Sequence, residues 1–89
     1  KEQVNTLIRQ NLLVIDDDNF KIQAVKMIFS RLGYDNIDIV GEEEEGLNMM
    51  EEKTYHLVLV SSRLLKDKVK FYERISKLER GLTQKVSLI

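Results

Sequence analysis

Two stretches of the sequence place reactive polar side chains directly after short apolar runs. Residues 12–15 (Leu-Leu-Val-Ile) are followed by three aspartates at 16–18, and residues 57–60 (Leu-Val-Leu-Val) are followed by Ser61. Neighbouring carboxylates repel one another unless a cation neutralises them. Carboxylate oxygens are also ligands that Mg²⁺ prefers in proteins. These residue types therefore indicate an acidic pocket that holds either a metal ion or a basic side chain.

The apolar runs predict the strands that would position this pocket. Four consecutive apolar residues between polar ones, as at 12–15 and 57–60, are typical of a strand buried on both faces of a parallel sheet. Residues 36–40 alternate polar and apolar side chains, which indicates a strand near a sheet edge. Residues 86–89 predict a fourth strand.

Three segments between these strands have helical patterns. Residues 20–32 repeat apolar side chains at helical spacing, with Ile22, Val25, Phe29 and Leu32 on one face. Asp18 or Asn19 is a candidate N-cap, and Gly33 is placed just past the end. The glutamates at 42–45 suit the solvated first turn of a second helix, where carboxylates complement the macrodipole. Residues 66–80 predict a third helix.

Apolar side chains on the last two helices predict how they pack. Leu47 and Met50 would dock the second helix, and Phe71, Ile75 and Leu78 recur at helical spacing along the third. At this spacing a Met is expected to fill the core rather than to bind a cofactor.

Strands that alternate with helices predict an α/β fold with a parallel sheet and helices on both faces. A flavodoxin-like doubly wound order, 2-1-3-4, would set the first strand beside the third. Ligands of such sheets bind beyond the carboxyl ends of the strands, where the strand order reverses. Asp16, Asp17 and Ser61 are therefore expected to meet at that point.

Bulk properties narrow the class of protein. The chain has 89 residues and no Cys, so it suits one small domain and excludes disulfides and thiolate metal sites. We expect a linker or short helix over residues 1–10 and the domain over 11–89. No apolar run is as long as a membrane span and no secretory signal is present, so we expect no membrane insertion and an intracellular, cytoplasmic location.

Charge is unevenly spread along the chain. Residues 1–62 carry six Lys/Arg against twelve Asp/Glu, whereas residues 63–89 carry eight against three, for a net charge of −1 overall. A nucleic-acid surface would need interleaved aromatic side chains, and only Phe71 and Tyr72 lie in the basic part. The pattern favours attraction between the two halves of one fold, and we expect no nucleic-acid partner.

The ordered set of motifs resembles the receiver domains of response regulators over residues 11–89. The resemblance is carried by Leu-Val-Ile-Asp-Asp-Asp at 13–18, Asn-Phe-Lys-Ile at 19–22, Leu-Gly-Tyr at 32–34 and Glu-Gly-Leu at 45–47. It implies an acidic pocket that binds a divalent cation, and a strand-end aspartate that accepts a phosphoryl group from a histidine kinase.

The chain departs from the receiver pattern at the acceptor. Ser61 stands where the resemblance requires the aspartate, and a serine hydroxyl is unionised at neutral pH and would form a long-lived ester. We therefore expect no cofactor and at most weak Mg²⁺ binding at Asp17. The small polar side chain of Ser61 is expected to hydrogen-bond to Asp17 or to backbone.

Two further departures concern the loop and the far end of the domain. Residues 63–69 lack the Pro and Gly that the family has there, and Arg63 or Lys66 could supply an internal counter-charge to Asp16 and Asp17. The family's fifth βα unit is also lacking from residues 1–89. The apolar fourth strand would then need a cover, which a protein partner could supply.

These expectations favour a non-catalytic pseudo-receiver, a regulatory or scaffolding protein-interaction module in a signalling protein or larger assembly. The alternative is an active receiver domain of a two-component phosphorelay, in a response regulator or hybrid histidine kinase, with Asp16 or Asp17 as substitute acceptor. A third possibility is a structural subunit that retains only the fold. His56, the only histidine, is expected at the surface and supports no catalytic triad.

Overall fold

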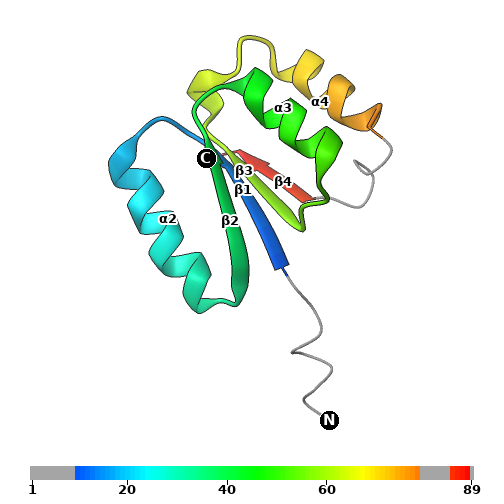
Figure 1. Ribbon diagram of the computed structural model, residues 1–89. Coiled ribbons are helices and arrows are strands. Elements are labelled where there is room, and N and C mark those ends of the chain that lie inside the picture. The colour runs from blue at the N-terminus through cyan, green and yellow to red at the C-terminus, as the bar shows by residue number, and fades with distance from the viewer. Residues whose placement is uncertain (1–9, 79–84, 89) are drawn as a thin grey trace.

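The computed structural model describes residues 10–78 and 85–88. The predicted linker, apart from Gln10, lies outside these residues. Strands and helices alternate along the described chain (Figure 1) in the order β1 (Gln10–Ile15), α2 (Asn19–Arg31), β2 (Tyr34–Val40), α3 (Glu43–Glu52), β3 (Leu57–Val60), the 3₁₀ turn η1 (Ser62–Leu64), α4 (Lys68–Ser76) and β4 (Lys85–Leu88).

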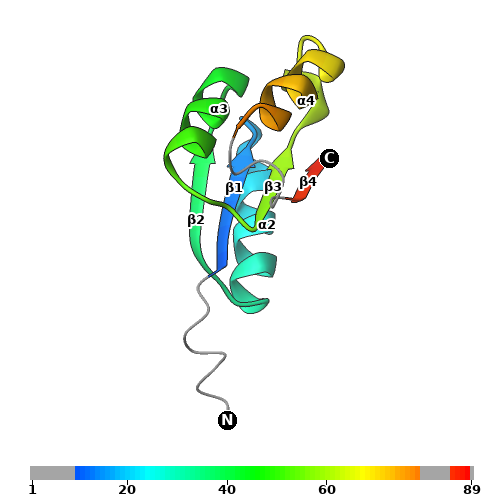
Figure 2. The same cartoon turned by 90° about the vertical axis from the view of Figure 1, so that its right-hand side faces the viewer.

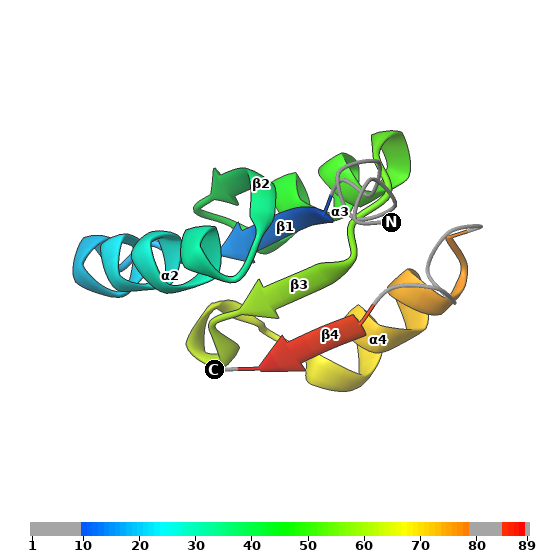
Figure 3. The same ribbon diagram turned by 90° about the horizontal axis from the view of Figure 1, so that it is seen from below.

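The four strands form one parallel sheet in the order β2-β1-β3-β4. This confirms the predicted order 2-1-3-4. Ile15 at the end of β1 pairs with Val40 on one side and Val60 on the other, so these three strands end at the same level. Figure 3 shows β3 and β4 side by side and running in the same direction.

Alternate residues of β1 serve two separate apolar layers. Leu13 and Ile15 face the layer that α3 and α4 cover, whereas Leu12 and Val14 face the layer beneath α2. Figure 1 shows α2 on one side of the sheet and α3 and α4 on the other, and in Figure 2 α2 lies behind the strands. The prediction of helices on both faces of the sheet is confirmed.

The core contacts of α3 and α4 follow their sequence patterns. Leu47 and Met50 are buried on α3, and Phe71 and Ile75 are buried on α4, with Leu78 packed alongside. The spacing of Leu47 and Met50, and of Phe71 and Ile75, places each pair on one face of its helix, as predicted. Leu78 lies beyond Ser76, the last residue of α4.

Helix α2 begins and ends where its capping residues predict. The Asp18 side chain accepts hydrogen bonds from the backbone N–H groups of Phe20 and Lys21. Gly33 has φ 102°, in the left-handed region that favours glycine, and it lets the chain turn into β2. Val25 and Phe29 pack on the sheet, but no residue of α2 is fully buried.

The third helix is shorter than the prediction. It starts at Lys68 rather than at Lys66 because Asp67 is its N-cap, whose side chain accepts a hydrogen bond from Lys70 N. Leu65, which precedes the helix, is buried in the core. It ends at Ser76, where Lys77 is the C-cap. The last two residues of the predicted span lie outside the described residues.

A polar cluster joins β2 to the chain just before β3. Tyr55 is buried, and its hydroxyl donates a 2.6 Å hydrogen bond to Asp38 Oδ2, which also lies 2.9 Å from Lys53 Nζ. Burial alone would raise the pKa of Asp38, but the hydrogen bonds from Tyr55 and Lys53 and the charge of Lys53 lower it overall. Burial, the bond to Asp38 and nearby carboxylates raise the pKa of Tyr55. His56 is exposed, as expected.

Candidate functional site

Asp16 and Ser61 lie next to one another at the carboxyl end of the sheet. Backbone hydrogen bonds continue one residue past each strand, from Asp16 N to Val40 O (3.0 Å) and from Ser61 N to Ile15 O (2.9 Å). Both side chains are only 1% exposed. The parallel register thus brings together two of the polar residues that the sequence predicted to meet.

The buried Asp16 carboxylate uses its two oxygens differently. Oδ1 accepts a 3.0 Å hydrogen bond from Asp18 N and lies 3.3 Å from Arg63 Nη2. Oδ2 has no hydrogen-bond partner among the described residues. A buried carboxylate needs a counter-charge, so the guanidinium is the group that compensates Asp16.

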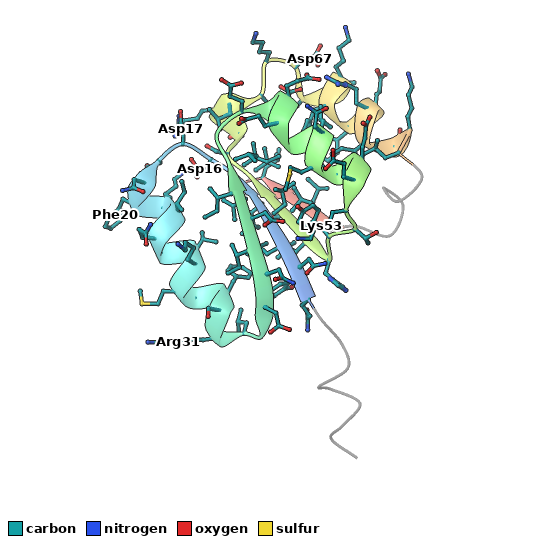
Figure 4. All side chains as sticks on the ribbon, viewed as in Figure 1. Asp16, Asp17, Phe20, Arg31, Lys53 and Asp67 are labelled. Atoms are coloured by element: carbon teal, nitrogen blue, oxygen red, sulfur yellow. The ribbon has the colours of Figure 1, made fainter. Side chains whose placement is uncertain are left out.

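Arg63 also contacts the third predicted residue of the pocket. It extends from η1, and its Nη2 donates to Asp17 Oδ1 as well as to Asp16 Oδ1. The hydrogen bond to Asp17 raises the pKa of Arg63, with smaller contributions from the charges of the neighbouring aspartates. Figure 4 shows Asp16 and Asp17 at the turn between β1 and α2. One guanidinium therefore spans both carboxylates, which are 47 and 46 residues away along the chain.

Lys66 does not share this role. In the described part of the chain it makes no ion pair with Asp16 or Asp17. It lines a separate hollow of about 580 Å³ between α3 and α4, together with Gly41, Glu42, Glu43, Glu44, Leu64, Asp67, Lys70 and Arg74. The two candidate counter-charges of the sequence are therefore separated, and only Arg63 reaches the acidic pocket.

The expected hydrogen bond of Ser61 is not formed. Its Oγ is buried and has no partner within residues 10–78 and 85–88, so the prediction that it bonds to Asp17 or to backbone is wrong. Asp17 Oδ1 instead accepts a hydrogen bond from Arg63.

The residues present do not fit a Mg²⁺ ion. Among the described residues, no group of three His, Cys, Asp or Glu side chains is arranged to hold a metal. Asp17 and one oxygen of Asp16 are engaged by a cation of the protein itself, and Ser61 offers a neutral hydroxyl in place of a third carboxylate. Mg²⁺ requires near-octahedral oxygen geometry, which this donor set does not supply while the guanidinium is in place.

One contact of the neighbouring hollow had no signal in the sequence. Arg74 of α4 forms a two-pronged ion pair with Glu44 of α3, with N–O distances of 3.0 and 2.9 Å. These residues are 30 positions apart, and only the packing of the two helices brings them together. The pair lowers the pKa of Glu44 and raises that of Arg74 through their mutual hydrogen bonds.

No family model matches the chain, and no curated protein or solved structure is significantly similar to it. Within the described residues, no helix is both long enough and apolar enough to cross a membrane.

Proposed function

We propose that this chain is a non-catalytic pseudo-receiver: a flavodoxin-like module that regulates or scaffolds a signalling protein or assembly inside the cell by protein–protein contact. The observation that carries the proposal is the guanidinium of Arg63, which spans the Asp16 and Asp17 carboxylates at the end of β1. An arginine of the chain thereby takes the place that a divalent cation would need.

The residue at the acceptor position supports a silent pocket. Ser61 is 1% exposed and its hydroxyl is directed into the protein, so a phosphoryl donor has poor access to it. Asp16 is equally buried, and Asp17 is paired with Arg63. The Ser61 hydroxyl and the Asp16 carboxylate are therefore enclosed, and Asp17 is engaged by a cation through Oδ1.

The same ion pairs favour a fixed conformation of the chain after β3. Arg63 belongs to η1, and the adjoining Leu65 is buried in the core beneath α3 and α4. The guanidinium and Leu65 hold this segment from two sides. We infer that the module presents one constant surface to its partners.

The test is incubation of the chain with acetyl phosphate and Mg²⁺, read by intact mass. We expect no labile phosphoryl adduct. An adduct that hydroxylamine removes would contradict the proposal and favour the active receiver of a phosphorelay. Asp16→Asn and Asp17→Asn variants would then show which carboxylate had accepted the group.

A further inference from the structure

Helix α2 exposes large apolar side chains on the side that faces away from the sheet. The exposed fractions are 84% for Phe20, 55% for Met27, 54% for Ile28 and 62% for Leu32. Figure 4 shows Phe20 directed away from the body of the protein. Isolated exposed apolar residues are ordinary, but three on one helix, with a fourth at its C-cap Leu32, form a group that marks an interaction surface.

The spacing of this stripe matches the seam of a helix pair. Phe20, Ala24, Met27 and Arg31 follow one another in steps of four, three and four, and Ile28 and Leu32 border them. Such steps keep side chains on one line along a helix, where a second helix packs. From Phe20 to Leu32 the stripe runs about 18 Å at 1.5 Å per residue. This narrow shape suits a helix as occupant.

The charges of α2 indicate the chemistry of that helix. Asn19–Arg31 contains Lys21, Lys26 and Arg31 and no Asp or Glu. None of the three cations belongs to an ion pair formed within the described residues. Arg31 projects into solvent at the C-terminal end of the stripe (Figure 4). A partner with carboxylates along its flanks would neutralise them.

A second copy of this chain is a poor occupant. Two α2 helices packed antiparallel along the stripe would set Lys26 near its counterpart, and Arg31 near Lys21 of the other copy. Like charges at such positions destabilise a helix pair, and α2 has no acid to offset them.

An anionic membrane is also disfavoured. Asp18 lies at the N-terminal end of α2, and the exposed Asp35 follows its C-terminal end. These carboxylates would approach the charged bilayer surface together with the apolar stripe, whereas a surface helix on a membrane carries mainly Lys and Arg on its polar side.

We propose that the outer face of α2 (Phe20, Ala24, Met27, Ile28, Arg31 and Leu32) docks an amphipathic helix of a partner protein whose apolar stripe is flanked by Glu or Asp. This surface is separate from the pocket of Asp16, Asp17 and Arg63. It stands even if that pocket is found to accept phosphate, so the two proposals fail independently.

The probe is a synthetic helical peptide with Leu along its seam and Glu on both flanks, titrated into the ¹⁵N-labelled chain. We expect saturable binding and shifts along residues 20–32. Ile28→Glu should weaken binding about tenfold or more, since it puts a carboxylate into the seam. Val69→Glu, at a 69% exposed position on α4, is the matched control and should leave the affinity unchanged. Circular dichroism checks that both variants fold.

A second peptide with Lys in place of every Glu tests the charge argument, and it should bind more weakly than the Glu peptide. Absence of saturable binding of the Glu peptide, equal binding of both peptides, or unchanged binding to Ile28→Glu overturns the proposal. Two other results would also overturn the proposal: a dimer of the free chain, or binding of the chain to phosphatidylserine vesicles, if Ile28→Glu abolishes it. Either result would assign the stripe to another occupant.

Discussion

Nη2 of Arg63 lies 3.3 Å from Oδ1 of Asp16, a carboxylate that is 1% exposed. The arginine side chain itself is 52% exposed, so this ion pair lies at the boundary between the core and water. The contribution of such a pair to stability is smaller than that of a fully buried one, because solvent screens the exposed partner. The ion pair has a larger effect on which cation, the guanidinium or a metal ion, the acidic pocket binds.

Replacement of Arg63 by Ala should therefore convert the pocket into one that responds to metal. Removal of the guanidinium leaves Asp16 and Asp17 adjacent without a counter-charge, and we expect a loss in the free energy of unfolding. Mg²⁺ should restore part of this loss in the variant and have little effect on the wild type. Urea unfolding with and without Mg²⁺ measures both effects.

Arg74→Ala is the matched control, because Arg74 pairs with Glu44, which is 62% exposed. It should lower the free energy of unfolding by less than Arg63→Ala does and show no dependence on Mg²⁺. Equal Mg²⁺ dependence in Arg63→Ala and Arg74→Ala would contradict the assigned role of Arg63.

Two substitutions of Ser61 should have opposite effects on stability. Its buried Oγ has no partner among the described residues, so Ser61→Ala removes an unsatisfied group and should be neutral or stabilising by up to about 1 kcal/mol. Ser61→Asp places a second carboxyl beside Asp16, and we expect it to destabilise by about 2–4 kcal/mol. Thermal or urea unfolding decides between these signs.

The control for the aspartate is Ser87→Asp at an exposed position of β4. It should cost less than about 1 kcal/mol, since the added charge stays in water. If Ser61→Asp is no more destabilising than Ser87→Asp, the pocket tolerates a third carboxylate, and the argument for a silent pocket is wrong.

The strands, and the position of Ser61 beside Asp16, could be predicted because the sequence carries strong local signals for them. The apolar run at 57–60 is too short and too uniform for a surface element, and the parallel order then places Ser61 beside Asp16 without further information. Asp18 and Gly33 were also predictable, because a cap acts within a few residues of its own position.

What could not be predicted depends on side-chain direction and tertiary packing. The sequence named both Arg63 and Lys66 as candidates, and the 3₁₀ turn Ser62–Leu64, which has no periodic signature, directs only Arg63 to the aspartates. The bond between Tyr55 and Asp38 likewise requires β2 and the chain before β3 to be in place. Periodicity set Leu32 on the line of Val25 and Phe29, yet it is 62% exposed because it is the C-cap, beyond the last turn.

The cluster of Asp38, Tyr55 and Lys53 should make stability depend on pH in acid. The pKa of Asp38 in the folded protein is lowered from 3.8, so its ionised form stabilises the fold above that value. This contribution is lost as the pH falls through and below 3.8. Tyr55→Phe removes the 2.6 Å hydrogen bond and should cost about 2 kcal/mol near neutral pH. The difference from wild type should shrink in acid, as measured by urea unfolding across this range.

Tyr72→Phe is the matched control, since Tyr72 is 41% exposed and lies on α4, away from Asp38. It should change stability little at any pH. A difference between Tyr55→Phe and wild type that is constant from neutral pH into acid would show that the hydroxyl is not bonded to an ionised Asp38.

The close approach of α3 to the end of β1 depends on Gly46. A Cβ added at this position would lie 2.7 Å from Ile15 Cγ1 and would also contact Ile15 Cδ1. Gly→Ala within a helix ordinarily stabilises by about 1 kcal/mol. At Gly46 the clash should reverse the sign, with a net loss of about 1–3 kcal/mol. Asn48→Ala, at an exposed position of the same helix, should keep the ordinary sign and raise the free energy of unfolding by roughly a few tenths of a kcal/mol.

Because the clash is with Ile15, the double variant Gly46→Ala/Ile15→Val should lose less stability than the sum of the losses of the two single variants. Unfolding free energies of the four proteins in this cycle measure the coupling, and strict additivity would show that Ile15 is not what excludes a side chain at position 46.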